Sequence, residues 1–128
     1  MIHRWEEFQS LKTRLNGDEI RVSVNERGNI YLSRSALDAL NGPEAVVLLF
    51  DREHRTIGIM RAAADRRNAH RLKKKDRRGR GMTVYAADFL RHYDVKLDRT
   101  MAFKQPILDE NGFLVLDLNT LVPINGPN

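Results

Sequence analysis

Four histidines are the residues of this chain best suited to binding a metal ion or moving a proton at neutral pH. No two of them stand at the spacing that would place both on one face of a helix, and each falls in a different kind of segment: His3, His54, His70 and His92. The chain has no cysteine, which excludes disulfides, thiolate zinc sites and cysteine nucleophiles. The sequence therefore predicts no metal centre and no cofactor.

An acid–base cluster is the second chemical arrangement that the sequence offers. Asp51, Glu53 and His54 share one polar turn, and Asp109 and Glu110 form a similar acidic turn later in the chain. Charged residues commonly solvate hairpin tips, so we interpret both turns as exposed tips. The stretch "RRGRGMT" lacks the lysine and hydroxyl residue that end a phosphate-binding loop, and no serine lies in a G-x-S-x-G motif. We expect a protein that is not an enzyme.

Positive charge is the chemistry that the sequence does concentrate. Between Arg61 and Arg80, seven arginines and three lysines stand against two aspartates, a net charge of +8, whereas the other 108 residues sum to −3. Leu72 is the only large apolar residue between Met60 and Met82. A helix here would have no apolar face to bury. We therefore predict that residues 62–80 form a mobile basic arm or linker.

Such an arm is suited to a polyanion, because each phosphate that a cation neutralises releases counterions. The arm contains no aromatic residue on which bases could stack, so we expect it to contact the nucleic-acid backbone and to carry little sequence information. The residues expected to make these contacts are Arg66, Arg67, Arg71, Lys73, Lys74, Lys75, Arg77, Arg78 and Arg80. A solvated linker and a nuclear sorting signal are the alternative interpretations of this segment.

The first 17 residues have the pattern of an amphipathic helix. Apolar side chains recur at spacings of three and four, and Asn16-Gly17 is a suitable stop; the apolar residues are Ile2, Trp5, Phe8, Leu11 and Leu15. We interpret this segment as a helix packed on the core of its own domain. A dimerisation helix is the alternative.

Residues 18–61 have the pattern strand, strand, short helix, strand, strand. Ile20, Val22 and Val24 alternate with polar residues, "NERG" is a tight turn, and the alternation resumes at residue 30. Ser35 and Asp38 stand at capping-box spacing, so a short helix is expected to begin near residues 33–35 and to end at "NGP". Residues 46–50 are apolar without a break, which predicts a strand covered on both faces.

The stretches "NERGNIYLSRSALDALNG" and "AVVLLFDREHRTIGI" resemble the AbrB-like swapped-hairpin DNA-binding domain. The resemblance implies an α+β fold: a small β-barrel of swapped-hairpin type, built from strand-strand-helix-strand-strand units that two chains interleave, here with an N-terminal helix. It also implies that arginines on the exposed face contact DNA, which in this region points to Arg21, Arg27 and Arg34. Asn29 stands where the family usually has a basic residue and could pair with adenine.

Residues 81–122 have the pattern of a second, degenerate βαββ unit, followed by a tail at 123–128. Leu32, Leu37 and Leu40 fall opposite Tyr85, Leu90 and Tyr93 at an offset of 53 residues. A doubled relative of the AbrB-like family, of MraZ type, is the comparison that this repeat suggests. The two halves could then form one pseudo-symmetric barrel within a single chain.

The function expected from these features is DNA binding, with transcriptional regulation as the role that the resemblance implies, in a phage, plasmid or toxin–antitoxin setting. We expect duplex DNA as the partner in preference to single strands, and a homodimer or higher oligomer. No apolar run approaches the roughly eighteen residues of a membrane span, so we expect a cytoplasmic protein without a membrane partner. The alternatives are a protein–protein adaptor or antitoxin-like module with a solvated linker, and a single-stranded nucleic-acid binder.

Overall fold

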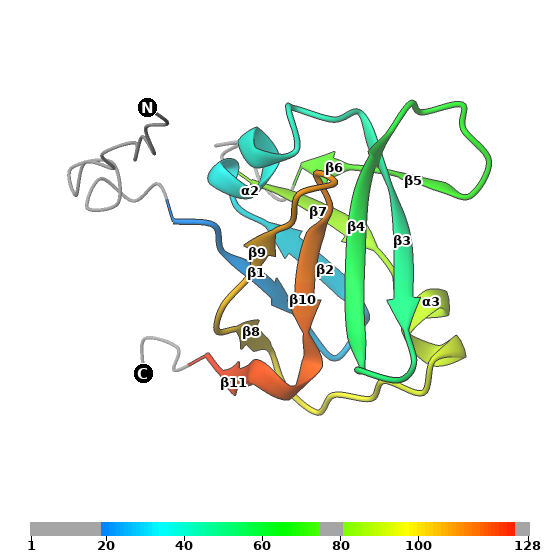
Figure 1. Ribbon diagram of the computed structural model, residues 1–128. Helices are drawn as coiled ribbons and strands as arrows, with labels where there is room; N and C mark the ends of the chain where they lie inside the picture. The colour runs from blue at the N-terminus through cyan, green and yellow to red at the C-terminus, as the bar shows by residue number, and fades with distance from the viewer. Residues whose placement is uncertain (1–18, 75–80, 125–128) are drawn as a thin grey trace, which may run out of the picture.

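The protein is described by a computed structural model that covers residues 19–74 and 81–124. Their strands form two antiparallel sheets (Figure 1). Sheet A has the strand order β11-β8-β1-β2-β7-β6, which are respectively Leu121–Pro123, Met101–Phe103, Val22–Val24, Asn29–Leu32, Met82–Tyr85 and Lys73–Lys74. Sheet B has the order β5-β3-β4-β10-β9, which are Ala69–Arg71, Ala45–Asp51, Thr56–Ala62, Leu114–Asp117 and Ile107–Leu108. Helices α2 (Arg34–Ala39) and α3 (Ala87–His92) are short, and a 3-10 turn, η1, spans Leu118–Thr120.

The core lies between the two sheets. In β1, β2 and β7, apolar residues alternate with polar ones, and the apolar side chains point towards sheet B, which lies in front of sheet A in Figure 1. The most deeply buried side chains of the strands are Val22, Val24, Ile30, Leu32 and Val84 from sheet A, and Val46, Ile57, Ile59, Leu114 and Leu116 from sheet B. Each such side chain stabilises the fold by about 1.5–3 kcal/mol relative to exposure.

The predicted swapped-hairpin barrel is wrong. Over the described ranges the strands form two separate sheets, each with its own edge strands, and no hydrogen-bonded ladder closes them into a barrel. The reason lies in the pairing of the second half. It adds β7 and β8 to the two sides of the β1–β2 hairpin, and β10 to the free side of the β3–β4 hairpin. The same chain therefore supplies the strand partners that the interleaved-dimer analogy assigns to a second copy.

The turn and helix of the first half follow from local residue chemistry. Gly28 ends the Asn25–Gly28 turn with φ +88°, a conformation that glycine adopts without steric cost. Ser33, rather than Ser35, caps α2: its Oγ accepts hydrogen bonds from the backbone N–H of Ala36 at 3.2 Å and of Arg21 at 3.0 Å. The cap thus fixes both the start of α2 and the approach of β1.

The offset of 53 residues recurs in the structure. Strand β2 and helix α2 span residues 29–32 and 34–39, while β7 and α3 span 82–85 and 87–92. Strands β2 and β7 pair with each other at the centre of sheet A. Beyond the helices the halves differ, because β3 lies in sheet B whereas β8 lies in sheet A. The division of the chain into domains stays a prediction.

The basic segment is built into both sheets over the part that the structure describes. Its first residues complete β4, β5 then pairs with β3 at an edge of sheet B, and β6 pairs with β7 at an edge of sheet A. Leu72, between β5 and β6, is 8% exposed and belongs to the core, and its N–H donates to the carbonyl of Glu44 at 3.3 Å. Residues 69–74 are therefore two docked strands and not the mobile arm that the composition predicts.

Several predictions fall on residues outside the description. These are the amphipathic helix at residues 1–17, the four basic residues Lys75, Arg77, Arg78 and Arg80, and most of the tail at 123–128. Among the helices of residues 19–74 and 81–124, none is long and apolar enough to span a membrane.

Candidate nucleic-acid interface

The turn of the first hairpin is held by one asparagine. The Oδ1 atom of Asn25 accepts the backbone N–H of Arg27 and of Asn29, each at 3.0 Å, and the N–H of Gly28 donates to the Asn25 carbonyl at 3.0 Å. This network leaves Arg27 exposed at the tip and places Asn29, half-buried, at the start of β2. The network thus fixes the backbone at Arg27 and Asn29, the two predicted base-reading residues.

Arg21 and Arg34 each face an acidic neighbour at the surface. The Nε of Arg21 lies 3.8 Å from a carboxylate oxygen of Glu19, and the Nε of Arg34 lies 3.5 Å from one of Asp38. All four side chains are more than half exposed, so each pair contributes at most about 1 kcal/mol. An incoming phosphate could displace either carboxylate at small cost.

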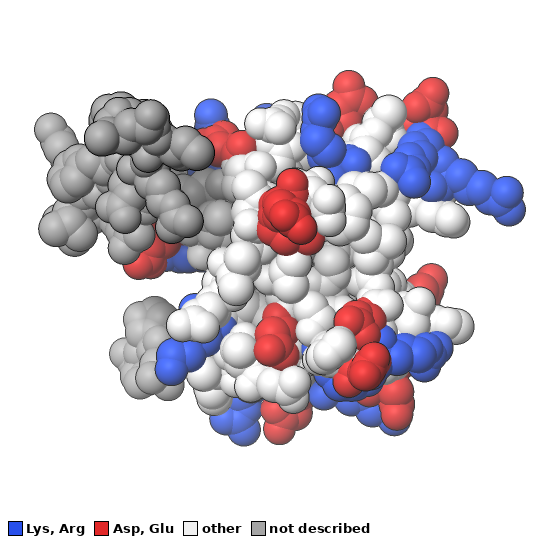
Figure 2. All heavy atoms as spheres, in the orientation of Figure 1, with Lys and Arg blue, Asp and Glu red and all other residues white. Residues whose placement is uncertain are grey.

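The described cations of the basic segment follow the joined edges of the two sheets. Arg66 and Arg67 lie in the turn between β4 and β5, Arg71 ends β5, and Lys73 and Lys74 form β6; all five are exposed. On the face that Figure 2 shows, Lys and Arg side chains likewise gather around the rim and leave the middle of β3 and β4 without charge. The cations therefore flank the sheets and do not cover the face of sheet B.

A hollow of about 230 Å³ lies on the outer face of sheet A, on the side away from the core. Its lining residues come from five segments of the chain and are Ser23, Asn25, Asn29, Tyr31, Lys74, Thr83, Tyr85 and Thr100. Strand register places them together, because Asn29 is opposite Tyr85, and Tyr31 is opposite both Ser23 and Thr83. None of the residues that line it is acidic. We refer to this feature as the sheet-A hollow.

The sheet-A hollow combines three kinds of group that bind nucleic acids. Lys74 brings a cation from the basic segment, amides and hydroxyls offer hydrogen bonds, and Tyr85, 60% exposed, offers a ring face for stacking. Of its residues, only Asn29 and Lys74 are predicted from the sequence. The polar alternation in "VSV", "NIYL" and "MTVY" is the signal that could have located the others, since it marks the outer faces of three strands.

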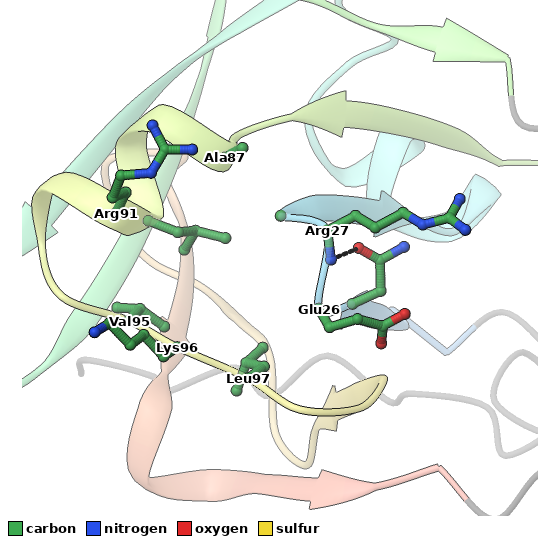
Figure 3. Close-up of a pocket in the computed structure, with 10 residues that line it drawn as sticks. Glu26, Arg27, Ala87, Arg91, Val95, Lys96 and Leu97 are labelled. Atoms are coloured by element: carbon green, nitrogen blue, oxygen red, sulfur yellow. Dashed lines mark hydrogen bonds between the residues drawn. The ribbon is translucent and has the colours of Figure 1, made fainter.

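A second hollow, of about 200 Å³, has Arg27 in its lining and shares Asn25 with the sheet-A hollow. It lies between the Asn25–Gly28 turn and α3, with Ala87, Leu90, Val95 and Leu97 as apolar lining (Figure 3). Arg91 and Lys96 also line it, but the side chain of Arg27 points away from Arg91 in Figure 3. This hollow therefore does not focus positive charge on one point.

The acidic turn of the β3–β4 hairpin is an exposed tip. Nδ1 of His54 lies 2.8 Å from Oδ2 of Asp51, and Oδ1 of Asp51 accepts the backbone N–H of Glu53 at 3.0 Å and of His54 at 3.2 Å. The hydrogen bond from the His54 side chain, aided by those from the backbone, lowers the pKa of Asp51. In the parts of the chain that are described, no group of three or more His, Cys, Asp or Glu residues could hold a metal ion.

Comparison with known proteins identifies no relative of this chain. No protein-family model matches it, and neither a curated protein nor a solved structure does. The resemblance to AbrB-like domains therefore stays a hypothesis, and functional inference rests on the geometry of the chain itself.

Proposed function

We propose that the protein binds DNA through the outer face of sheet A and the basic strands at its edge. The observation that supports this most directly is the meeting of Lys74, from the segment of net charge +8, with Asn29 and uncharged polar groups in one hollow without acidic lining residues. An acid-free polar surface beside a row of cations is complementary to a phosphate backbone with exposed bases.

In this proposal, Arg66 and Arg67 in the turn before β5, and Lys73 and Lys74 of β6, contact phosphates. If all four do so, the logarithm of the binding constant falls with the logarithm of the salt concentration with a slope of about −3.6. Strands β1 and β2 both have further neighbours in sheet A, so this hairpin is not a free ribbon that could enter a major groove. Direct contact with bases would come from its turn, through Arg27, and from the hollow, through Asn29.

The role in transcription that the AbrB-like resemblance implies would make the protein a cytoplasmic regulator of duplex DNA, acting as a dimer. Single-stranded nucleic acid is the second candidate partner, and Tyr85 is the observation that favours it. A ring that is 60% exposed beside a cationic edge is the arrangement on which unpaired bases stack.

Fluorescence anisotropy with labelled duplex and single-stranded probes, at several salt concentrations, tests the proposal. The Lys73→Ala/Lys74→Ala variant should bind all sequences more weakly and flatten the salt slope by about 2. The Arg91→Ala/Lys96→Ala variant is the matched control, because it removes the same charge beside the second hollow and should leave the slope unchanged. Absence of binding to either probe at low salt contradicts the proposal and favours the adaptor alternative.

Tyr85 separates the two nucleic-acid partners. Tyr85→Ala should weaken single-strand binding by about 1–3 kcal/mol for each base that stacks, whereas Tyr85→Phe retains the ring and should retain the affinity. Duplex DNA remains the partner if Tyr85→Ala leaves single-strand binding unchanged. It also remains the partner if each variant changes the affinity for the two probes equally.

A further inference from the structure

The outer face of sheet B carries two adjoining rows of apolar residues. Cross-strand register places Val47 beside Met60 and Ala69 in one row. In the next row, Leu49, Gly58, Val115 and Ile107 follow one another across four strands. No charged side chain interrupts either row. In the second row Leu49 is 37% exposed and Ile107 is 58% exposed, so this row meets solvent, whereas Val47 in the first row is buried.

Neither helix covers this face. Phe89 of α3 packs edge-on against Phe50, and Tyr93, which follows α3, stacks on the same ring. Phe50 alternates with Leu49 along β3 and so lies on the opposite side of the sheet. Figure 2, seen from the side of β3, β4 and β10, shows the middle of β3 and β4 without charged groups. A contiguous apolar sheet face of this kind ordinarily marks an interaction surface.

The two ends of the face carry opposite charge. Arg71 lies opposite Ala45 at one end, whereas Asp51 and Asp117 lie opposite Thr56 at the other. Two arginines of the β3–β4 turn are engaged with rings, Arg52 over Tyr93 and Arg55 over Phe50, while His54 lies 2.8 Å from one oxygen of Asp51. A copy of this face turned end to end would therefore be complementary to it in charge as well as in hydrophobicity.

We propose that a second copy of this chain covers the outer face of sheet B. The twofold axis lies between the two copies of sheet B and runs across their strands. This symmetry stacks the apolar rows of the two copies. It places Arg71 across the gap between the stacked sheets from Asp51 of the partner subunit, with a sideways offset of about one strand spacing, 4.8 Å. Sheets stacked in this way pack at about 10 Å, as in a sandwich core.

The arrangement has a consequence that rests on the proposed DNA binding. Within one chain the two sheets pack through their inner faces, so the outer faces of sheets A and B point in opposite directions. A dimer joined through sheet B would therefore present two sheet-A hollows on opposite sides and could bridge two nucleic-acid segments. The oligomeric state is measured without nucleic acid, so failure of one proposal is distinguishable from failure of the other.

Sedimentation equilibrium of the full chain tests the interface. The wild-type chain should be a dimer, and Leu49→Lys/Ile107→Lys should be a folded monomer, because both side chains are exposed and the fold does not depend on them. The matched control is Val122→Lys/Ile124→Lys, which places the same charges on exposed apolar residues outside this face and should remain dimeric. Circular dichroism verifies that both variants fold.

Charge reversal provides a second measurement. Arg71→Glu places a negative charge opposite the acidic end of the partner subunit. It should raise the dimer dissociation constant by roughly tenfold or more, and this difference should decrease at high salt. A monomeric wild-type chain overturns the proposal and would make residues 1–17 of the same chain the next candidate to cover the face. A dimer that survives Leu49→Lys/Ile107→Lys overturns it as well.

Discussion

At the scale of single residues, Gly28 joins the first hairpin to the helix of the second half. Its carbonyl accepts the N–H of Ala86 at 2.9 Å, and a Cβ at this position would lie 2.5 Å from Cα of Ala87. Gly28→Ala should therefore cost about 3 kcal/mol or more in the free energy of unfolding, the sum of left-handed strain and collision. Gly112 also has a positive φ, +82°, but no atom lies near its Cβ position.

Gly112→Ala is thus the matched control for the conformational cost alone, about 1–2 kcal/mol. Urea denaturation of the two variants measures the difference. Equal losses of stability would contradict close packing of the hairpin turn against α3.

Asp51 permits a pH-dependent prediction at the same scale. The hydrogen bond from His54 lowers the pKa of this carboxyl below its ordinary value, so the folded state binds the proton less readily than the unfolded state. The resulting stabilisation is present above the unfolded pKa and is lost as the pH falls through the folded pKa. In an NMR titration, His54→Ala should raise the midpoint of Asp51, whereas His92→Ala should leave it unchanged. An unaltered midpoint in His54→Ala would contradict the assigned cause.

At the scale of elements, Leu72 decides whether the basic segment is docked. Its side chain, 8% exposed, lies in the core between β5 and β6. Leu72→Ala should lower the free energy of unfolding by about 2–3 kcal/mol. Leu108→Ala is the control, because Leu108 is 40% exposed on the edge strand β9. This variant should lower the free energy of unfolding by less than about 1 kcal/mol. If the Leu72→Ala variant is as stable as the wild type, residues 66–74 are a mobile arm and are not docked on the sheets.

The basic segment also shows where inference from sequence to element fails. Alternation of apolar and polar residues predicted the strands around Val22 and Ile30, and Gly28 marked the turn between them. Residues 69–74 carry no such pattern, because they pair at sheet edges, where one buried leucine and backbone hydrogen bonds are enough. The lack of an apolar face therefore suggested a mobile arm or linker. The start of α2, by contrast, lies within the predicted residues 33–35, with Ser33 as its cap.

At the scale of the whole molecule, alternation indicates which side chains face the core but not which strands become neighbours. The pairing of β2 with β7, which brings Asn29 beside Tyr85, joins segments from the two halves of the chain. The basic residues of the candidate interface could be found from composition, whereas the sheet-A hollow could not. Its lining is assembled by long-range pairing, which also replaced the expected barrel with two sheets.

This shared pairing predicts that neither half folds alone. A fragment of residues 1–78 would leave β2 without β7, β1 without β8 and β4 without β10, and would remove fully buried side chains such as Val84, Leu114 and Leu116 from the core. Unpaired strand edges and a missing core wall are both strongly destabilising. Fragments 1–78 and 79–128 should each lack a cooperative thermal transition by circular dichroism, and their mixture should recover one. A cooperative transition in fragment 1–78 alone would instead show that the first half folds independently, with a second copy supplying its missing strands.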